Sequence, residues 1–348
     1  MVGPREVIAV HKELIAVAIL SSVVAWGADE PWVTFDGFQG PGEGRHVVLI
    51  TGDEEYRSEE SMPQLARILA ARHGFRCTVL FAVTPETGEI DPTVVDHIPG
   101  LEALDSADLM VLFTRFRELP DEQMRHIIDY TNSGRPIIAL RTATHPFNYT
   151  KHLDSPYACW SFRATGDFDG GYGRQVLGET WVNHYGVHQK ESTRGLVAPG
   201  MEGHPIVRGC EDIWGPSDVY QITTLTGDSE PVIMGQVLTG MDPADPPNPD
   251  RQLVPVAWTK TYTGTQGKPS RVFTTTMGHA GDLVSEGFRR LLVNAVYWAV
   301  GLEEQIPTRA DVALVGRYEP TPIGLGGHKR GVRPRDHRLV PTDFANGM

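Results

Sequence analysis

Several features that mark large protein classes are missing from this sequence. Its 348 residues include only three cysteines, which is too few for a disulfide framework, and none of them has the spacing of a metal site. There is no P-loop and no GxGxxG, GxSxG or HExxH motif. These absences argue against a nucleotide-binding protein, a dehydrogenase and a serine hydrolase.

Positive charge is also scarce. The chain has 31 Lys and Arg against 44 Asp and Glu, a net charge of −13, and its one basic stretch is residues 328–338. Since phosphate contacts require clustered Lys and Arg, we expect no nucleic-acid partner, and we interpret the basic stretch as a solvated or surface-draped tail. With 40% hydrophobic and 22% charged residues, the composition is that of an ordinary soluble globular protein.

Only one stretch of the chain has the length and apolar character of a targeting segment, residues 14–25. Arg5 and Lys12 precede it, and a small-x-small pattern ends it. This predicts a signal peptide over residues 1–28, then a linker over 29–44, and therefore a periplasmic or secreted protein. An uncleaved N-terminal anchor and a misassigned start codon are the alternatives, and we expect no other membrane contact.

Strands and helices alternate through the first half of the chain. Short β-branched runs predict buried strands, and apolar stripes of helical spacing between them predict helices. The predicted strands are 46–52, 75–83, 107–115 and 136–140, and helices begin near Ser58 and Asp121. Such alternation predicts a mostly parallel sheet covered on both faces. Three further strands and a closing helix are predicted at 231–238, 254–262, 271–277 and 284–300.

In a parallel sheet, ligands bind beyond the carboxyl ends of the strands. Three loops are candidates for the location of the site: residues 51–57, 114–120 and 141–149. The last belongs to GRPIIALRTATHPF (134–147), in which an apolar run stops at Arg141. Several α/β enzymes present a Ser or Cys nucleophile at such a turn, whereas this chain offers an arginine.

The sequence resembles the ThuA-like (trehalose-utilisation) family of the class I glutamine amidotransferase-like superfamily. The resemblance covers residues 45–302 and rests on HVVLITGDEEYRSEE, GRPIIALRTATH, GHPIVRGCEDIWGPSDVY and RVFTTTMGHAGD…LLVNAVYWAVGL. It implies an α/β fold, a flavodoxin-like three-layer sandwich with a mostly parallel central sheet, followed by a C-terminal tail over 303–348. Because Arg141 stands where amidotransferases carry the catalytic Cys, the chain is not expected to be a glutamine amidotransferase.

The family's association with disaccharide and keto-sugar catabolism implies a carbohydrate substrate. The candidate catalytic residues are Glu54 and Glu55 as acid and base, Arg141 as a binder of an anion or carbonyl oxygen, and His145 and His184 beside the pocket. The alternative for the two acids is a structural role just before the N-terminus of the next helix, where negative charge interacts favourably with the helix dipole. For Arg141, the alternative is a buried ion pair with Glu54 or Glu55.

A second set of residues is predicted to bind the substrate or a metal. The segment GETWVNHYGVHQKESTRG (178–195) carries His184 and His188 four residues apart, which on a helix would fit a divalent metal. The alternative for this segment is a loop of satisfied polar residues over the edge of the sheet. For Asp282, the alternative is the N-cap of the last helix. The candidate substrate-binding residues are Tyr56, Arg57, Trp181, Asn183, Arg194, His279 and Asp282.

The sequence thus predicts a protein that processes a sugar or keto-sugar glycoside by acid/base chemistry without a Cys nucleophile. The rival hypothesis is a noncatalytic, amidotransferase-like module that binds a glycan or a protein partner. The cofactor stays unknown, with a divalent metal as one option, and a homo-oligomer is compatible with the sequence. The substrate, the bond broken and a Cys159–Cys210 pairing stay open.

Overall fold

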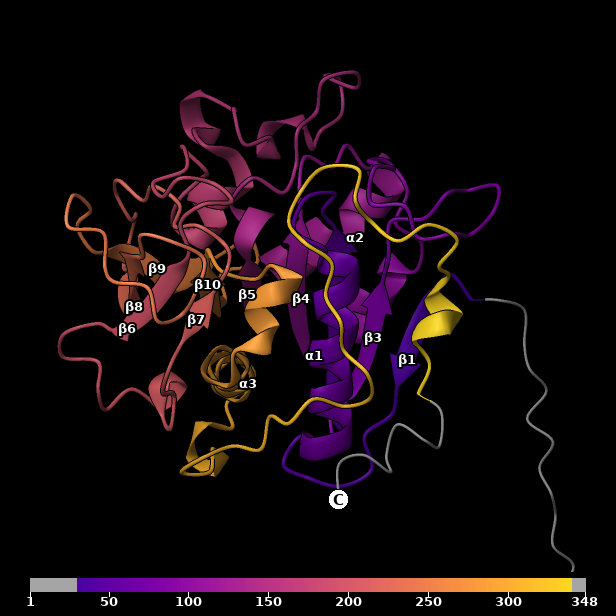
Figure 1. The fold of residues 1–348 in the computed structure, drawn as a ribbon. Helices are drawn as coiled ribbons and strands as arrows, with labels where there is room; N and C mark the ends of the chain where they lie inside the picture. The colour runs from indigo at the N-terminus through magenta and orange to yellow at the C-terminus, as the bar shows by residue number, and fades with distance from the viewer. Residues whose placement is uncertain (1–29, 340–348) are drawn as a thin grey trace, which may run out of the picture.

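One sheet of ten strands runs through residues 30–339, the part of the chain that the computed structural model describes (Figure 1). The strands follow one another across the sheet in the order β1-β3-β2-β4-β5-β10-β9-β8-β6-β7. Their bounds are β1 Trp32–Phe35, β2 His46–Gly52, β3 Arg76–Leu80, β4 Leu109–Thr114, β5 Ile137–Leu140, β6 Thr193–Val197, β7 Trp214–Gly215, β8 Glu230–Val237, β9 Val254–Thr263 and β10 Pro269–Thr275. The signal peptide predicted over residues 1–28 lies outside the described residues.

The sheet is mixed. Strands β3, β2, β4, β5 and β10 form a parallel centre, while β1 on one side and β9, β8, β6 and β7 on the other pair antiparallel. The expectation of a mostly parallel sheet is therefore wrong, and the flavodoxin-like sandwich is not confirmed. Helical crossovers join the parallel strands of the first half, whereas β9 and β10 are joined by a short hairpin loop, which gives antiparallel pairing.

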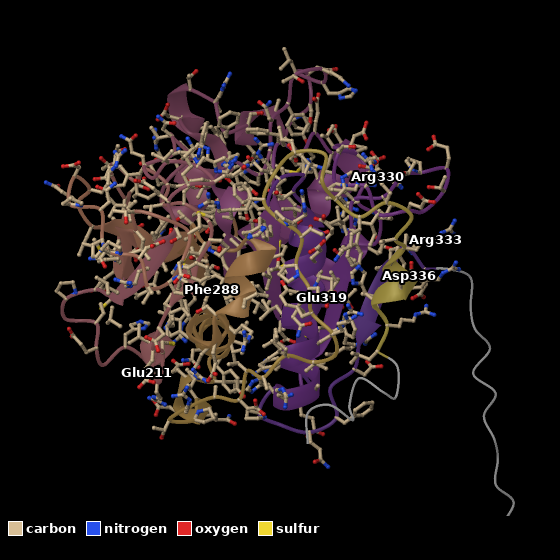
Figure 2. All side chains as sticks on the ribbon, in the orientation of Figure 1. Glu211, Phe288, Glu319, Arg330, Arg333 and Asp336 are labelled. Carbon is tan, nitrogen blue, oxygen red and sulfur yellow. The ribbon has the colours of Figure 1, made fainter. Side chains whose placement is uncertain are left out.

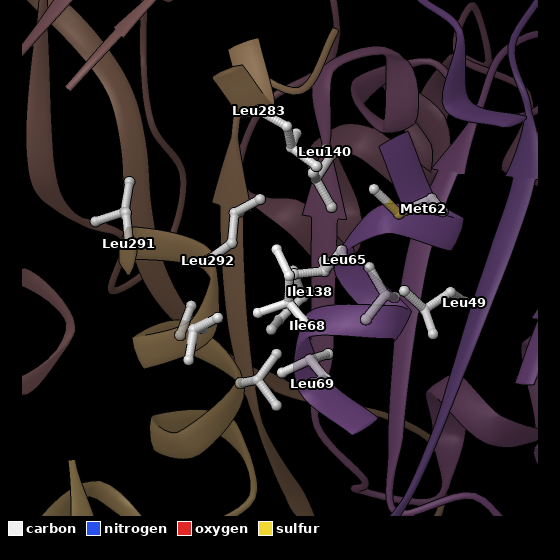
Figure 3. Packing of buried hydrophobic residues seen from close by; sticks show 14 of the residues in the cluster. Leu49, Met62, Leu65, Ile68, Leu69, Ile138, Leu140, Leu283, Leu291 and Leu292 are labelled. Atoms are coloured by element: carbon white, nitrogen blue, oxygen red, sulfur yellow. The ribbon is translucent and has the colours of Figure 1, made fainter. Parts of the chain in front are cut away.

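Three α-helices lie within residues 30–339: α1 Ser58–His73, α2 Asp121–Asn132 and α3 Glu286–Ala299. Alternate residues of the central strands point to opposite faces and form two apolar clusters. Leu49 and Ile138 pack with α1 and α3 in the cluster of Figure 3, whereas Ile50 and Ile137 pack with α2 in the other. The sequence pattern thus placed the core strands correctly.

The helix ends follow recognisable capping rules. Gly74, at φ 79°, ends α1 in the left-handed region that favours glycine, and its N–H bonds back to the helix. Ser285, rather than Asp282, caps α3 by accepting from the Phe288 N–H. Ser58 does not cap α1; its hydroxyl accepts from the N–H groups of Gly52 and Asp53. Ser58 therefore ties the end of β2 to the start of α1.

A C-terminal strap, defined here as residues 306–339, crosses the outer side of α1 (Figure 1). Figure 2 shows the strap side chains Glu319, Arg330, Arg333 and Asp336 along this path. Hydrogen bonds fasten the strap to α1, among them one from Arg67 Nη2 to the carbonyl of His337 at 2.7 Å. No helix in the described part of the chain has the length and apolar character needed to cross a membrane. Cys77, Cys159 and Cys210 are all free thiols.

Candidate functional site

The turn after β5 lies beside the loops that follow β2 and β4. Arg141 opens a 3-10 turn, Arg141–Thr144, in which the Thr142 hydroxyl donates to the carboxylate of Asp53. Arg115, just after β4, donates to the carboxylate of Glu54, just after β2. The three candidate loops of the sequence analysis therefore meet at one edge of the sheet, as expected for the carboxyl ends of parallel strands.

Unusual backbone conformations gather at this edge. Among described residues other than glycine, positive φ angles occur at Arg57, Phe116, Arg141, Gln189 and Asp212. Arg57, Phe116 and Arg141 belong to the three loops just described, and Gln189 directly follows His188. Such conformations cost free energy and cluster at functional sites, so they support a site here.

Arg141 is fully buried, and its amino groups all bond to protein. Nη1 donates to the carbonyls of Asp218 at 2.5 Å and Thr276 at 2.7 Å, and Nη2 donates to Asp218 Oδ1 at 2.7 Å and to the Tyr56 hydroxyl at 3.1 Å. The guanidinium also lies 3.7 Å from the centre of the Tyr220 ring. Arg141 therefore positions Asp218: both Nη groups are engaged with protein, and only the buried Nε is without a hydrogen-bond partner.

Asp218 joins two histidines at the surface of the site. Its Oδ2 lies 2.7 Å from His184 Nδ1, and its Oδ1 lies 2.9 Å from His188 Nδ1. His188 Nε2 lies 3.2 Å from Glu55 Oε1, so this ring bridges two carboxylates. Hydrogen bonds to Asp218 and Glu55 raise the pKa of His188 to about 9. Burial opposes ionisation of Asp218, but Arg141 and the two histidines outweigh it and leave its pKa well below the usual range.

The histidines lie on a loop rather than on a helix. The N–H groups of Tyr185 and Gly186 both donate to the carbonyl of Val219, at 2.8 and 3.1 Å. This pins residues 184–188 against the segment that carries Asp218. The four-residue spacing thus brings His184 and His188 together without helical geometry.

The two predicted acids differ in their surroundings. Glu54 is held by Arg115 and by Arg117, whose Nη2 lies 3.0 Å from Oε2, whereas Glu55 is shared between Arg115 and His188. Burial, with Asp53 nearby, raises the pKa of Glu54. Burial acts in the same direction on Glu55, but His188 and Arg115 outweigh it and lower its pKa. Glu55 is therefore the one of the two acids that contacts His188.

His145 lies beneath this cluster in an aromatic pocket. Its ring centre is 5.0 Å from that of Phe116 and 5.3 Å from that of Trp181. Burial holds its pKa well below the usual range, so the ring is neutral. Trp181 also contacts His184, with 5.9 Å between ring centres, and Asn183 Oδ1 accepts from the His184 N–H. These residues shape the wall around His184.

The other candidate binding residues are engaged around the site rather than in it. Arg57 donates to Thr321 and Gly324 of the strap, and Arg194 donates to Gln236 and to the loop at 243–245. His279 Nδ1 accepts from the Gly281 N–H, and Asp282 accepts from Ser217 and Gly278. Tyr56 packs at the cluster, 6.0 Å from His188 between ring centres.

Sequence reasoning missed Asp218, Tyr220, Arg115 and Arg117. The first two end the segment GHPIVRGCEDIWGPSDVY, and the last two alternate in TRFRELP, directly after a buried strand. Polar residues that follow a buried strand are a usable signal for the two arginines. Asp218 gave no such signal, because its partners lie far away along the chain.

The fold and site define an α/β protein with a mixed sheet, in which the turn after β5 carries a buried arginine beside two histidines and an aspartate. The chain belongs to the ThuA family, described as trehalose utilisation, whose sequence profile matches residues 46–299. This membership indicates a carbohydrate-related function.

Comparison with solved structures found ThuA-like proteins. One, from Parabacteroides merdae, is 18% identical with a TM-score of 0.44, and the match covers 74% of this chain and 90% of that one. Another, from Bacteroides uniformis, is 16% identical with a TM-score of 0.44, covering 76% of this chain and 94% of that one. No curated protein sequence matches this chain.

Proposed function

We propose that the chain processes a sugar or keto-sugar glycoside at the cluster of Glu55, His184, His188 and Asp218. The chemistry is acid/base and uses no covalent thiol intermediate. Membership of the trehalose-utilisation family supports the substrate class. The observation that carries the proposal is the His188 ring between two carboxylates, beside a second histidine that Asp218 orients.

The geometry suggests a role for each group. Glu55 is the proton-transfer residue, because it is the carboxylate in contact with His188. His184 and His188 face the substrate oxygens, since their side chains remain 29% and 25% exposed while Asp218 is buried. Arg141 is a positioning residue that acts through Asp218.

The cysteines support the exclusion of thiol chemistry. Cys77 is buried within β3, and burial raises the pKa of its thiol. The thiols of Cys159 and Cys210 contact the carbonyls of Pro156 and Ile206, away from the cluster. A thiolate nucleophile therefore has no place beside Glu55 and the histidines.

The test is an assay of the purified chain with p-nitrophenyl glucoside, trehalose and a 3-keto-sugar glycoside. Because removal of a positioned acid/base group costs about 10²–10⁴-fold in rate, we expect losses of that order for Glu55→Gln and His184→Ala. His152→Ala is the matched control, since this histidine is exposed and pairs with Glu118 elsewhere. Thermal unfolding of each variant separates a lost group from a lost fold.

The outcomes separate the two functions under consideration. If Glu55→Gln and His184→Ala leave every detected activity unchanged, the catalytic proposal is wrong. If a sugar binds in calorimetry without any turnover, the noncatalytic binding module replaces it.

A further inference from the structure

We propose that His184, His188 and Asp218 bind a divalent transition-metal ion, with zinc as the first choice. The proposal deepens the proposed function because the ion would act on substrate oxygens at the same site. Binding of the ion itself does not require that function to be correct, so the two can fail separately.

The donor set is the first support. Each of the three side chains offers a ligand atom within 4.8 Å of the others, and within residues 30–339 this is the one group of His, Cys, Asp or Glu side chains so arranged. Two imidazoles and one carboxylate form the protein side of many catalytic zinc sites. Imidazole ligands favour zinc and its transition-metal neighbours over magnesium or calcium, which prefer oxygen.

The surroundings of the three side chains are the second support. His188 directs Nδ1 at Asp218 while its Nε2 lies 3.2 Å from Glu55 Oε1. Asp218 is itself held by Arg141, with 2.7 Å between Oδ1 and Nη2. Metal-binding histidines usually donate their second nitrogen to a carboxylate, and ligating carboxylates are themselves hydrogen-bonded, so Glu55 and Arg141 are in the expected places.

The exposure of the ligands leaves room for a substrate. Asp218 is buried and rigidly held, while His184 and His188 are partly exposed on a loop. Ligands at 2.0–2.1 Å around a tetrahedral ion lie roughly 3.3 Å apart, so the imidazoles must move back by about half an ångström from their present contacts of 2.7 and 2.9 Å. Three protein ligands leave a fourth position for a substrate oxygen, which the ion would polarise beside Glu55.

The test measures metal binding directly on the full chain. The protein is treated with a chelator, dialysed and titrated with Zn²⁺ by calorimetry and with Co²⁺ by visible absorption. We expect one ion per chain, loss of affinity of at least about tenfold for His184→Ala and for His188→Ala, and a loss of about 10–100-fold for Glu55→Gln. His152→Ala should bind as the wild type does, and metal-free thermal unfolding shows whether each variant is folded.

Two results would overturn the metal site. One is the absence of a one-to-one complex tighter than about 10 µM, and the other is unchanged binding by a folded His184→Ala variant. Turnover that persists after complete metal removal, together with either result, rejects the ion and leaves the proposed function standing. Tight binding without any turnover supports the ion and rejects the function.

Discussion

Arg141 shows how one residue can organise the whole edge of a sheet. It holds Asp218 through a carbonyl and a carboxylate oxygen, and its guanidinium packs against the rings of both Tyr56 and Tyr220. Since both histidines depend on Asp218, the position of the cluster depends on a residue that touches neither of them.

Arg141→Ala should therefore be strongly destabilising. Removing one partner of a buried ion pair leaves an unpaired charge and costs about 3–5 kcal/mol. The measurement is urea unfolding of the wild type and the variant. Arg45→Ala is the control, because Arg45 forms an exposed pair with Asp108 that is worth at most about 1 kcal/mol. Equal losses for the two variants would contradict the assigned role of Arg141.

Glu59 provides a second prediction for a single residue. It is buried on α1, neither carboxyl oxygen has a hydrogen-bond partner, and burial raises its pKa to about 8. The folded chain thus holds this proton more tightly than the unfolded chain, whose carboxyl titrates near the ordinary value of 4.5. The stabilisation is complete below about pH 4.5 and is lost as the pH rises through about 8.

Glu59→Gln should remove this part of the pH dependence. Because one pKa unit corresponds to about 1.4 kcal/mol, the wild type should lose a few kcal/mol relative to the variant between about pH 5 and 9. Denaturant unfolding across this range measures the difference, with the exposed Glu102→Gln as control. Parallel curves for the wild type and Glu59→Gln would show that Glu59 is not held in its protonated form.

At the scale of elements, the C-terminal strap is coupled to the acidic loop of the site. Arg57 donates to Thr321 Oγ1 at 3.0 Å and to the Gly324 carbonyl at 2.5 Å, and the Gly324 N–H donates to the Glu55 carbonyl. Thr321 also donates its N–H and hydroxyl to Glu60 of α1. The strap thus supports the backbone of the residue to which we assign proton transfer.

Thr321→Val should loosen the segment at residues 53–60 without removing any side chain of the site. The variant keeps its shape but loses the hydroxyl bonds to Arg57 and Glu60, at a cost of about 1–3 kcal/mol. We expect faster amide hydrogen exchange at residues 53–60, measured by mass spectrometry. Thr93→Val, in an exposed turn, is the control. Unchanged exchange at 53–60 would mean that the strap does not support the loop.

For the whole molecule, the local sequence pattern predicted where the strands lie better than whether neighbouring strands run parallel or antiparallel. The strands around Val47–Ile50 and Ile137–Leu140 followed from short apolar runs, because buried parallel strands have that composition. The antiparallel run from β10 to β7 could not be predicted in the same way, since strand direction depends on pairing rather than on local pattern. The convergence of the first three loops followed from topology, whereas Asp218 reaches Arg141 across 77 positions through tertiary packing alone.

The burial of Arg141 also limits which substitutions position 141 can accept. A cysteine placed at position 141 would leave the Asp218 carboxylate without its arginine partner, and Tyr56 and Tyr220 without the guanidinium that packs against both rings. A thiol at this position would therefore require further changes around it, because the Asp218 carboxylate and the two tyrosine rings contact the guanidinium. Arg141 and its neighbours form one interdependent unit, in which position 141 cannot change alone without disturbing the carboxylate that both histidines contact.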